Sequence, residues 1–331
     1  MGDRRVGLVL TIVLAVLALV GISAALLLLD TRATGADALR TGGLAAGSIV
    51  ALYALWLNDR RRRTEEQRHA LEHDRVADER FARAVELLGS EADQVRVGAL
   101  HALAGLARTN PAYTRTVIDV LCSYLRRPFL HPRYGDDPLQ AADGEPGWSQ
   151  RERHEADRKL GIRLTAQRLI TELLPAADDD AAPAYDLDLT GAALEYFDLS
   201  DRKIGSVVLR HALLRSSNNF SRCAFLGPVW LTGATIGSGR LSGRVRCEDA
   251  VFHGRAWFSG VDFSGPASFD RTLFAGEVKF ARSRFGDRIT FRDAEFTGPA
   301  DLRAIDFAED PDFAGTTWAQ PPRTDAPLPG L

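Results

Sequence analysis

Histidines and cysteines are the residues of this 331-residue chain that could bind a metal or act as nucleophiles. His69 and His73 lie four residues apart on an expected helix, a spacing that would let two imidazoles share one zinc ion. No third ligand of matching spacing follows, so we interpret the pair as part of a charged, solvated helix. Cys122, Cys223 and Cys247 lack the paired spacing of a zinc site. Cys223 and Cys247 fall on inward repeat positions and are interpreted as small core residues in a reducing cytosol. The sequence therefore predicts no metal.

Motifs for other chemistry do not occur either. The chain contains no GxxxxGK[ST] phosphate loop and no GxSxG nucleophile elbow. The carboxylate pairs Glu248-Asp249 and Glu309-Asp310 are interpreted as polar surface and not as catalytic dyads. We predict no catalytic residue, no cofactor and no small-molecule substrate, so the chain is not expected to be an enzyme. The formal net charge of −3 gives no reason to expect a nucleic-acid ligand.

A ladder of large apolar residues fills the C-terminal half of the chain. From residue 252 onward its steps alternate between six and five, so the pattern repeats every eleven residues. A helix face would need steps of three and four, and a half-buried strand would need steps of two. A longer fixed period indicates a solenoid, whose units bury their apolar residues by stacking on neighbours. The ladder residues assigned to the core are Leu189, Leu194, Leu199, Ile204, Leu209, Leu214, Phe220, Phe225, Phe252, Phe258, Phe263, Phe269, Phe274, Phe280, Phe285, Phe291, Phe296, Phe307 and Phe313.

The residues around each centre also follow a pattern. The residue two before the centre is usually small or β-branched, and glycine recurs two after it, as at Gly260 and Gly276. A glycine there fits a corner that needs a backbone shape other residues resist. Counting Leu231, Ile236, Leu241 and further centres gives 25 units from residue 189 to residue 318.

These units resemble the pentapeptide-repeat family, whose five-residue repeat has a small residue, a polar one, a central Leu or Phe, a polar one and often Gly. The resemblance covers residues 186–318. It implies a right-handed quadrilateral β-helix with four units per coil and the central residue pointing inward. The extra residue in alternate units is interpreted as a wider corner.

Four units per turn would stack residues that are 22 apart in the sequence. Phe252 should then lie on Phe274, and Phe263 on Phe285. Coils ~4.8 Å apart would make about six coils and a rod of roughly 30 Å. The predicted fold is a transmembrane helical hairpin, then a small α-helical module, then a right-handed β-helix solenoid of about six coils.

The N-terminal region predicts two membrane spans. Residues 6–29 carry no charge, and at ~1.5 Å per residue such a helix exceeds a hydrocarbon core of ~30 Å. A second apolar stretch covers residues 41–57. A secretory signal has a shorter apolar run, and its cleavage should leave a soluble protein. Residues 1–63 are therefore expected to form two transmembrane helices with a short outside loop.

Basic residues set the expected orientation of these spans. Arg60, Arg61, Arg62 and Arg63 follow the second span, which places both termini in the cytoplasm by the positive-inside rule. We prefer this interpretation, with attraction to anionic lipid, to a nucleic-acid patch. The glycines of this region could let the helices approach closely or merely fill a short span, and the sequence leaves both readings open. They are Gly42, Gly43 and Gly47.

The middle of the chain, residues 64–182, is expected to be an α-helical module. Helical spacing of apolar residues runs from 64 to about 128 and again over 159–174, with an irregular loop at 128–158 between them. The helices resemble a HEAT or armadillo-type hairpin. They would cap the N-terminal end of the β-helix, because an open coil end is an unpaired edge. Residues 176–184 are read as an acidic hinge, residues 183–318 as the β-helix and residues 319–331 as a disordered tail.

The expected function is a non-enzymatic, membrane-tethered scaffold that presents a rigid cytoplasmic β-helix to a protein partner. The expected partners are the lipid bilayer and an unidentified cytoplasmic protein, with homo-oligomerisation left open. The expected location is a bacterial inner membrane, with multiple passes and with the N-terminus and the C-terminal domain cytoplasmic. The resemblance offers an alternative, because some pentapeptide-repeat proteins bind DNA topoisomerases by mimicking duplex DNA. Residues 185–331 hold 19 Asp and Glu against 17 Arg and Lys, which is a weak acidic balance for such mimicry.

Overall fold

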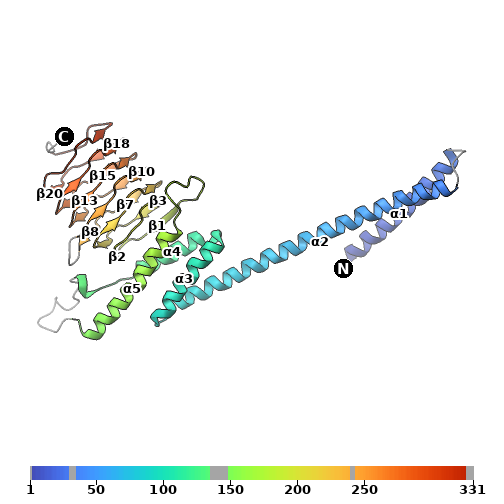
Figure 1. Ribbon diagram of the computed structural model, residues 1–331, viewed down its shortest axis with the longest axis horizontal. Coiled ribbons are helices and arrows are strands. Elements are labelled where there is room, and N and C mark those ends of the chain that lie inside the picture. The colour runs from blue at the N-terminus through green and yellow to red at the C-terminus, as the bar shows by residue number, and fades with distance from the viewer. Residues whose placement is uncertain (1, 30–34, 135–147, 239–242, 326–331) are drawn as a thin grey trace. The chain divides into compact units, whose positions relative to one another are not determined.

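The computed structural model describes residues 2–29, 35–134, 148–238 and 243–325. These residues form helices first and short strands afterwards, from blue to red in Figure 1. The chain divides into two compact units, Met1–Asp78 and Glu79–Leu331. Each unit is considered separately.

The first unit contains helix α1 (Gly2–Leu29) and most of helix α2 (Gly35–Leu88). The two helices pack closely at Gly42, where an added Cβ would lie 2.7 Å from the carbonyl oxygen of Leu19. Gly43 and Gly47 have no neighbour within contact distance of such a Cβ. Of the three glycines, Gly42 alone thus brings the helices together.

One helical segment among the described residues is long and apolar enough to cross a membrane. It is Leu39–Asn58, with 20 residues and a mean hydropathy of 1.3, and it begins inside the stretch expected to connect the spans. In α1 the apolar part found there is shorter, Leu10–Ala25. Length and composition thus support the second expected span and do not establish the first. The turn expected to lie outside the membrane includes residues 30–34, which fall outside the described residues.

The second unit begins with the end of α2 and three further helices, which are α3 (Asp93–Thr109), α4 (Thr114–Leu125) and α5 (Gln150–Leu173). Two 3-10 turns, η1 (Pro111–Tyr113) and η2 (Pro132–Tyr134), flank α4. Buried side chains such as Leu103, Leu121 and Leu169 join these helices in one core.

The loop expected over 128–158 is wrong at its C-terminal end, because α5 already begins at Gln150. Ser149 and Glu152 form a capping box, with the Ser149 hydroxyl accepting the Glu152 N–H and the Glu152 carboxylate accepting the Ser149 N–H. This cap starts the helix without any apolar residue. The charged first turns of α5 therefore carry no apolar period that could mark them as helical.

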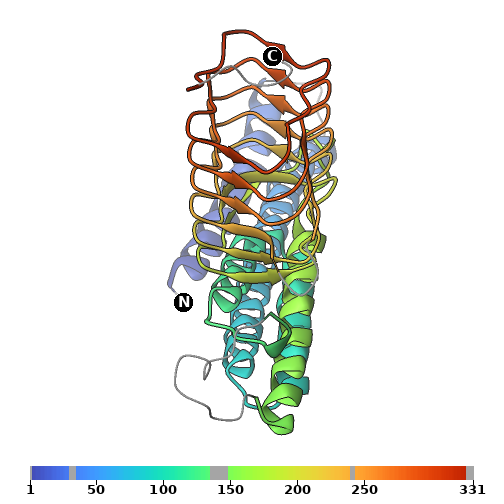
Figure 2. The ribbon, with the colours of Figure 1, turned by 90° about the vertical axis from the view of Figure 1, so that its left-hand side faces the viewer.

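Residues 185–318 wind into a solenoid of about six coils whose strands pair in parallel from coil to coil. Figure 2 shows the coils as successive rungs, running from yellow to red. The strands lie on four faces. Face 1 comprises β1 (Tyr185–Asp188), β7 (Val229–Trp230), β11 (Ala256–Trp257), β15 (Val278–Lys279) and β19 (Ala300–Asp301). Face 2 comprises β2 (Ala193–Glu195), β4 (Leu213–Arg215), β8 (Thr235–Ser238), β12 (Asp262–Phe263), β16 (Arg284–Phe285) and β20 (Asp306–Phe307).

The remaining strands complete the section of the solenoid. Face 3 comprises β5 (Asn218–Asn219), β9 (Val245–Arg246), β13 (Ala267–Ser268) and β17 (Ile289–Thr290). Face 4 comprises β6 (Ala224–Phe225), β10 (Val251–Phe252), β14 (Leu273–Phe274), β18 (Glu295–Phe296) and β21 (Thr317–Trp318). Strand β3 (Lys203–Val208) turns the corner between faces 4 and 1, because its start pairs with β6 and its end with β7.

The expected register of 22 residues per coil is confirmed for the later coils. Phe252 pairs with Phe274, and Phe263 pairs with Phe285. Their rings are stacked, with centroids 5.1 Å apart in the first pair and 4.5 Å apart in the second. One core therefore runs the length of the solenoid, and it continues without a break into the helices α3 to α5.

One coil is longer than the sequence pattern indicated. Ile236 pairs with Phe263, 27 residues further on, so this coil takes five residues more than the next. The N–H of Gly243 donates to the carbonyl oxygen of Gly237 at 2.8 Å and closes the extra segment. Leu241, counted as a centre, lies outside the described residues. The next strand that the structure describes is β9, whose Val245 and Arg246 pair with β5 and β13.

The corners fall into two kinds. From residue 258 onward, at the corners after five-residue units, the residue two after the centre has a positive φ, as in Gly260 (φ 64°) and Arg271 (φ 55°). At the wider corners after six-residue units, the glycines lack this conformation but sit against the preceding coil. A Cβ on Gly276 would overlap the carbonyl oxygen of Gly254. Glycine was expected because a corner needs a backbone shape that other residues resist, and this reason holds at the first kind of corner. At the second kind, glycine is needed because the backbone lies close to that of the preceding coil.

Candidate functional site

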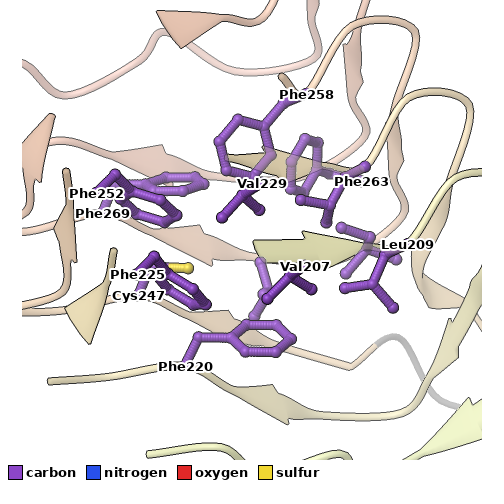
Figure 3. Close-up of a pocket in the computed structure, with 13 residues that line it drawn as sticks. Val207, Leu209, Phe220, Phe225, Val229, Cys247, Phe252, Phe258, Phe263 and Phe269 are labelled. Atoms are coloured by element: carbon purple, nitrogen blue, oxygen red, sulfur yellow. The ribbon is translucent and has the colours of Figure 1, made fainter. Parts of the chain in front are cut away.

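The ladder residues lie inside the solenoid and not at a surface site. Of those assigned to the core, only Phe307 is more than marginally exposed, because it belongs to the last coil. Figure 3 shows how rings such as Phe252 and Phe263 converge with Val229 on the lumen. A cavity of about 20 Å³ remains there, lined by apolar side chains. Such a space holds no polar partner for a water or a substrate, so it is a packing defect beside Cys247.

The cysteines are unsuited to nucleophilic chemistry. All three are buried and free. Burial raises the pKa of the Cys122 thiol to about 12, raises that of Cys223 to about 12 and raises that of Cys247 well above its ordinary value. Because the thiolate is the reactive form, these thiols act as core side chains.

Metal ligands do not converge in the described part of the chain, where no group of three or more His, Cys, Asp and Glu side chains could hold an ion. The side chains of His69 and His73 lie outside the described residues, although both positions belong to α2. The same is true of Arg60–Arg63, on which the expected membrane orientation depends.

The expected polar surface carries columns of ion pairs. Arg271 donates two hydrogen bonds to the Asp249 carboxylate, at 2.7 and 2.8 Å, one coil away. Arg222 binds Asp201 in the same bidentate way, at 2.5 and 2.7 Å. Hydrogen bonds from these guanidinium groups lower the pKa of both carboxylates. Glu248 accepts a hydrogen bond from the Ser221 hydroxyl at 2.7 Å, so the Glu248-Asp249 pair is occupied by structural contacts.

A polar stripe on α5 caps the first coil, a feature absent from the sequence-based expectations. Its members lie four residues apart on the helix and so share one side of it; they are Arg163, Gln167 and Thr171. The Gln167 side-chain N–H donates to the carbonyl oxygen of Glu195 at 2.8 Å, and its side-chain oxygen accepts the Glu195 N–H at 3.1 Å. Gln167 thus takes the place of a peptide group in a preceding coil.

The other two members of the stripe bind neighbouring carbonyl groups. Arg163 donates to the carbonyl oxygens of Ala193, at 2.9 Å, and Leu125, and the Thr171 hydroxyl donates to that of Asp198 at 2.6 Å. Burial lowers the pKa of Arg163 to about 10, so it remains charged at neutral pH. The expected cap at the N-terminal end is therefore present, and it blocks pairing at an open edge. The sequence feature that could have predicted this cap is a set of polar residues, four apart, inside the apolar face of α5.

The segment after α5 completes this cap. The N–H of Lys203 donates to the carbonyl oxygen of Pro175 at 2.9 Å. The Lys203 ammonium group donates to the carbonyl oxygens of Asp179, Asp180 and Ala182 at 2.7, 3.1 and 2.9 Å. Most of the segment expected as an acidic hinge is thus bound to the first coil through one lysine.

A buried carboxylate lies beside the cap. Glu195 is 2% exposed and accepts hydrogen bonds from the Tyr134 hydroxyl at 2.6 Å and the Ser216 hydroxyl at 3.2 Å. Burial, followed by the bond to Glu195, raises the pKa of Tyr134. The Arg215 guanidinium lies 4.8 Å from the centre of the Tyr134 ring. The Tyr134 hydroxyl therefore anchors η2 to the first coil through Glu195.

A groove of about 530 Å³ lies between α5 and the first coil. Its walls include Leu164 and Arg168 of α5 and Tyr196 of the coil. Glu172, one of its acidic groups, accepts hydrogen bonds from Arg108 at 2.5 Å and from Arg168 at 2.6 Å. The groove offers contact surface and no paired acid and base.

The described part of the chain thus presents surfaces for contact, organised by a regular solenoid. The pentapeptide repeats (9 copies) family model matches residues 248–295 and 258–306. This match confirms the resemblance drawn from the ladder, and the C-terminal region is a pentapeptide-repeat solenoid. No curated protein matches the chain.

Proposed function

We propose that the protein is a non-enzymatic scaffold that holds a protein partner at a bacterial inner membrane. The observation that carries this proposal is that the inward residues of the solenoid form its core while the outward residues form its surface. Inward positions stack in columns, as in the Phe274–Phe296 pair with centroids 4.8 Å apart, so outward positions are free to serve binding. Solenoids use such extended surfaces for protein contacts.

Tethering is the finer part of the proposal. Leu39–Asn58 supplies one span, and α1, packed on it at Gly42, supplies the second. The four arginines at 60–63 would keep the following residues in the cytoplasm. A preference for Arg over Lys and a high Ala content support a GC-rich bacterial source.

The test uses the full chain with a proximity-labelling enzyme fused to its C-terminus in living bacterial cells. We expect the chain in the inner-membrane fraction and a reproducible set of labelled cytoplasmic proteins. The matched control, Val50→Arg with Leu52→Arg, places two charges in the span and should release the chain and lose the labelled set. Labelling that does not differ between the two chains would contradict the scaffold.

The alternative remains inhibition or protection of a DNA topoisomerase by DNA mimicry. It requires a continuous acidic face, whereas the carboxylates of the later coils alternate with arginines, as in Arg292–Asp312 at 2.6 Å and Arg284–Asp306 at 3.7 Å. A supercoiling assay with the full chain in detergent decides it. Inhibition at saturation that a charge reversal such as Asp312→Arg relieves would favour the alternative over the scaffold.

A further inference from the structure

Face 4 carries an uncharged patch on the second, third and fourth coils. Its outward residues come from β6, β10 and β14 and the residue that follows the core ring in each; they are Ala224, Leu226, Val251, His253, Leu273 and Ala275. Leu226 is 44% exposed. In the same coils, faces 2 and 3 present charged side chains, among them Asp262 and Arg246, and face 1 presents Trp230 and Trp257, each with a cation over its ring. We call the six residues the apolar patch.

The patch has definite borders. Toward the N-terminus the outward residue of the first coil is Lys203, which the segment 179–182 covers. Toward the C-terminus the next outward residue is the exposed Glu295. One side is the corner that holds Arg222, Asp249 and Arg271. The other is the corner of Gly227, Gly254 and Gly276, where Pro228, Arg255 and Glu277 follow the glycines and Arg255 pairs with Glu277 at 3.8 Å.

The apolar patch is uncharged and includes the exposed Leu226, and the pattern of side-chain sizes within it indicates what could pack there. The patch has two columns of side chains. One column contains the residues before the core rings, which are Ala224, Val251 and Leu273, and the other contains the residues after them, which are Leu226, His253 and Ala275. The second coil has Ala224 beside Leu226, and the fourth has Leu273 beside Ala275. The large side chain thus lies in one column in the second coil and in the other column in the fourth coil.

This exchange makes the patch complementary to itself. If two copies face each other about a two-fold axis parallel to the solenoid, each column meets the other column. Leu226 then packs on Ala224 of the second copy, and Leu273 packs on Ala275. Val251 meets His253. No two large side chains collide, as a well-packed interface requires.

An antiparallel dimer, with its two-fold axis perpendicular to the solenoid, would match large side chains with small ones equally well. The charged residues beside the patch distinguish the two arrangements. The antiparallel axis would place Arg222 opposite Arg271 and Asp249 opposite its own copy, and like charges in contact are unfavourable. The parallel axis instead brings that corner to the glycine corner of the second copy. Trp230 and Trp257 lie beyond the glycines on face 1 and already accept cations, with Arg210 5.4 Å from the first ring and Lys279 4.7 Å from the second. Arginines can stack there.

We propose that a second copy of this chain packs on the apolar patch about a two-fold axis parallel to the solenoid, which gives a parallel dimer. Both first coils then lie at the same end of the dimer; that one membrane holds the two chains close together rests on the proposed tether. The face covers roughly 150 Å² over three coils, against ~800 Å² per partner in a stable complex. The solenoids alone should therefore associate weakly, and confinement to one membrane should raise their effective concentration.

The test is cross-linking between full-length chains in intact membranes. A chain with Val251→Cys and a differently tagged chain with His253→Cys are produced together and treated with a short bismaleimide, because packed sheets lie ~10 Å apart. The native cysteines are buried and free and so should not react. A matched control chain carries Thr235→Cys, outward on β8 of the opposite face.

We expect the mixed Val251→Cys and His253→Cys dimer to form at about ten times the yield of the Thr235→Cys control or more. Adding Leu226→Lys should reduce that yield by about tenfold, while Thr235→Lys should not, and equal thermal unfolding of both shows that the fold is kept. A dominant His253→Cys dimer with itself would overturn the parallel axis. Yields equal to the control would overturn the dimer, and a labelled partner set in the same cells would then leave the scaffold standing.

Discussion

The side-chain amide of Gln167 and the backbone of Glu195 exchange two hydrogen bonds, at 2.8 and 3.1 Å, as two neighbouring coils do. Both groups are buried. Replacing Gln167 with Leu should leave the Glu195 N–H and carbonyl without partners, at a cost of about 1–3 kcal/mol in the free energy of unfolding. Urea denaturation of the full chain in detergent measures this change.

The matched control for this substitution is Arg168→Leu, one residue along α5 on its exposed side. It removes a surface ion pair with Glu172 and should change the free energy of unfolding by less than ~1 kcal/mol. Equal losses for the two variants would show that the cap does not stabilise the first coil.

Stacking inside the solenoid predicts a second effect that depends on position. Phe285 is fully buried between Phe263 and Phe307, with ring centroids at 4.5 and 5.4 Å. Phe285→Ala should cost about 3–5 kcal/mol because it leaves a cavity that the stacked coils cannot close. Phe307→Ala should cost less, since Phe307 belongs to the last coil and is half-buried. Equal costs by thermal or urea unfolding would contradict this account.

Much of the solenoid can be predicted because its core has a strict sequence period. Each coil repeats one backbone path, so the spacing between Phe252 and Phe274 is enough to predict that they pair. The long coil between Ile236 and Phe263 was not predicted, because apolar residues continue the spacing of five and six through it and so conceal its five additional residues. Spacing alone does not show how many units make up one coil.

The hydrogen bonds of the cap and the apolar patch were not predicted, for a related reason. Gln167 interrupts an apolar helix face, and periodicity counts it as a defect until the open edge beside it is known. Leu226 and Leu273 sit beside core rings in the sequence, so they add to apolar content without showing which way they point. Only the coil geometry separates inward from outward positions.

The wider corners predict an asymmetry among glycine substitutions. Gly276→Ala should destabilise the protein by more than ~1 kcal/mol, because its Cβ would overlap the carbonyl oxygen of Gly254 and push the coils apart. Gly98→Ala, in the middle of α3 with nothing near an added Cβ, should stabilise by about 0.5–1 kcal/mol. Thermal unfolding of the two variants tests the contrast, and a neutral Gly276→Ala would show that the corner can relax.

Acid should weaken the solenoid through its corner carboxylates. The hydrogen bond from Arg271 holds the pKa of Asp249 below its ordinary value of 3.8. A depressed folded-state pKa means that the stabilisation is present above the unfolded pKa and is lost as the pH falls through the folded one. Between about pH 5 and about pH 2, the urea midpoint should therefore fall less steeply in Asp249→Asn than in the native chain. Asp287→Asn is the control, because among the described contacts the bond to the Asp287 carboxylate comes from the backbone N–H of Arg288, at 2.7 Å, and not from a guanidinium group. Identical slopes in all three chains would contradict the argument.

The buried thiols predict how the second unit unfolds. Burial raises the pKa of Cys122 in α4 and of Cys223 in the solenoid to about 12, so at about pH 8 neither should react with a thiol reagent while the protein is folded. Ser268→Cys, which adds an outward thiol on β13, should react at once and serves as the control. Because the helices and the coils share one core, Cys122 and Cys223 should become reactive together as urea is raised. Mass spectrometry of the labelled peptides measures both, and labelling of Cys122 well before Cys223 would show that the helical module opens by itself and does not fold as one unit with the solenoid.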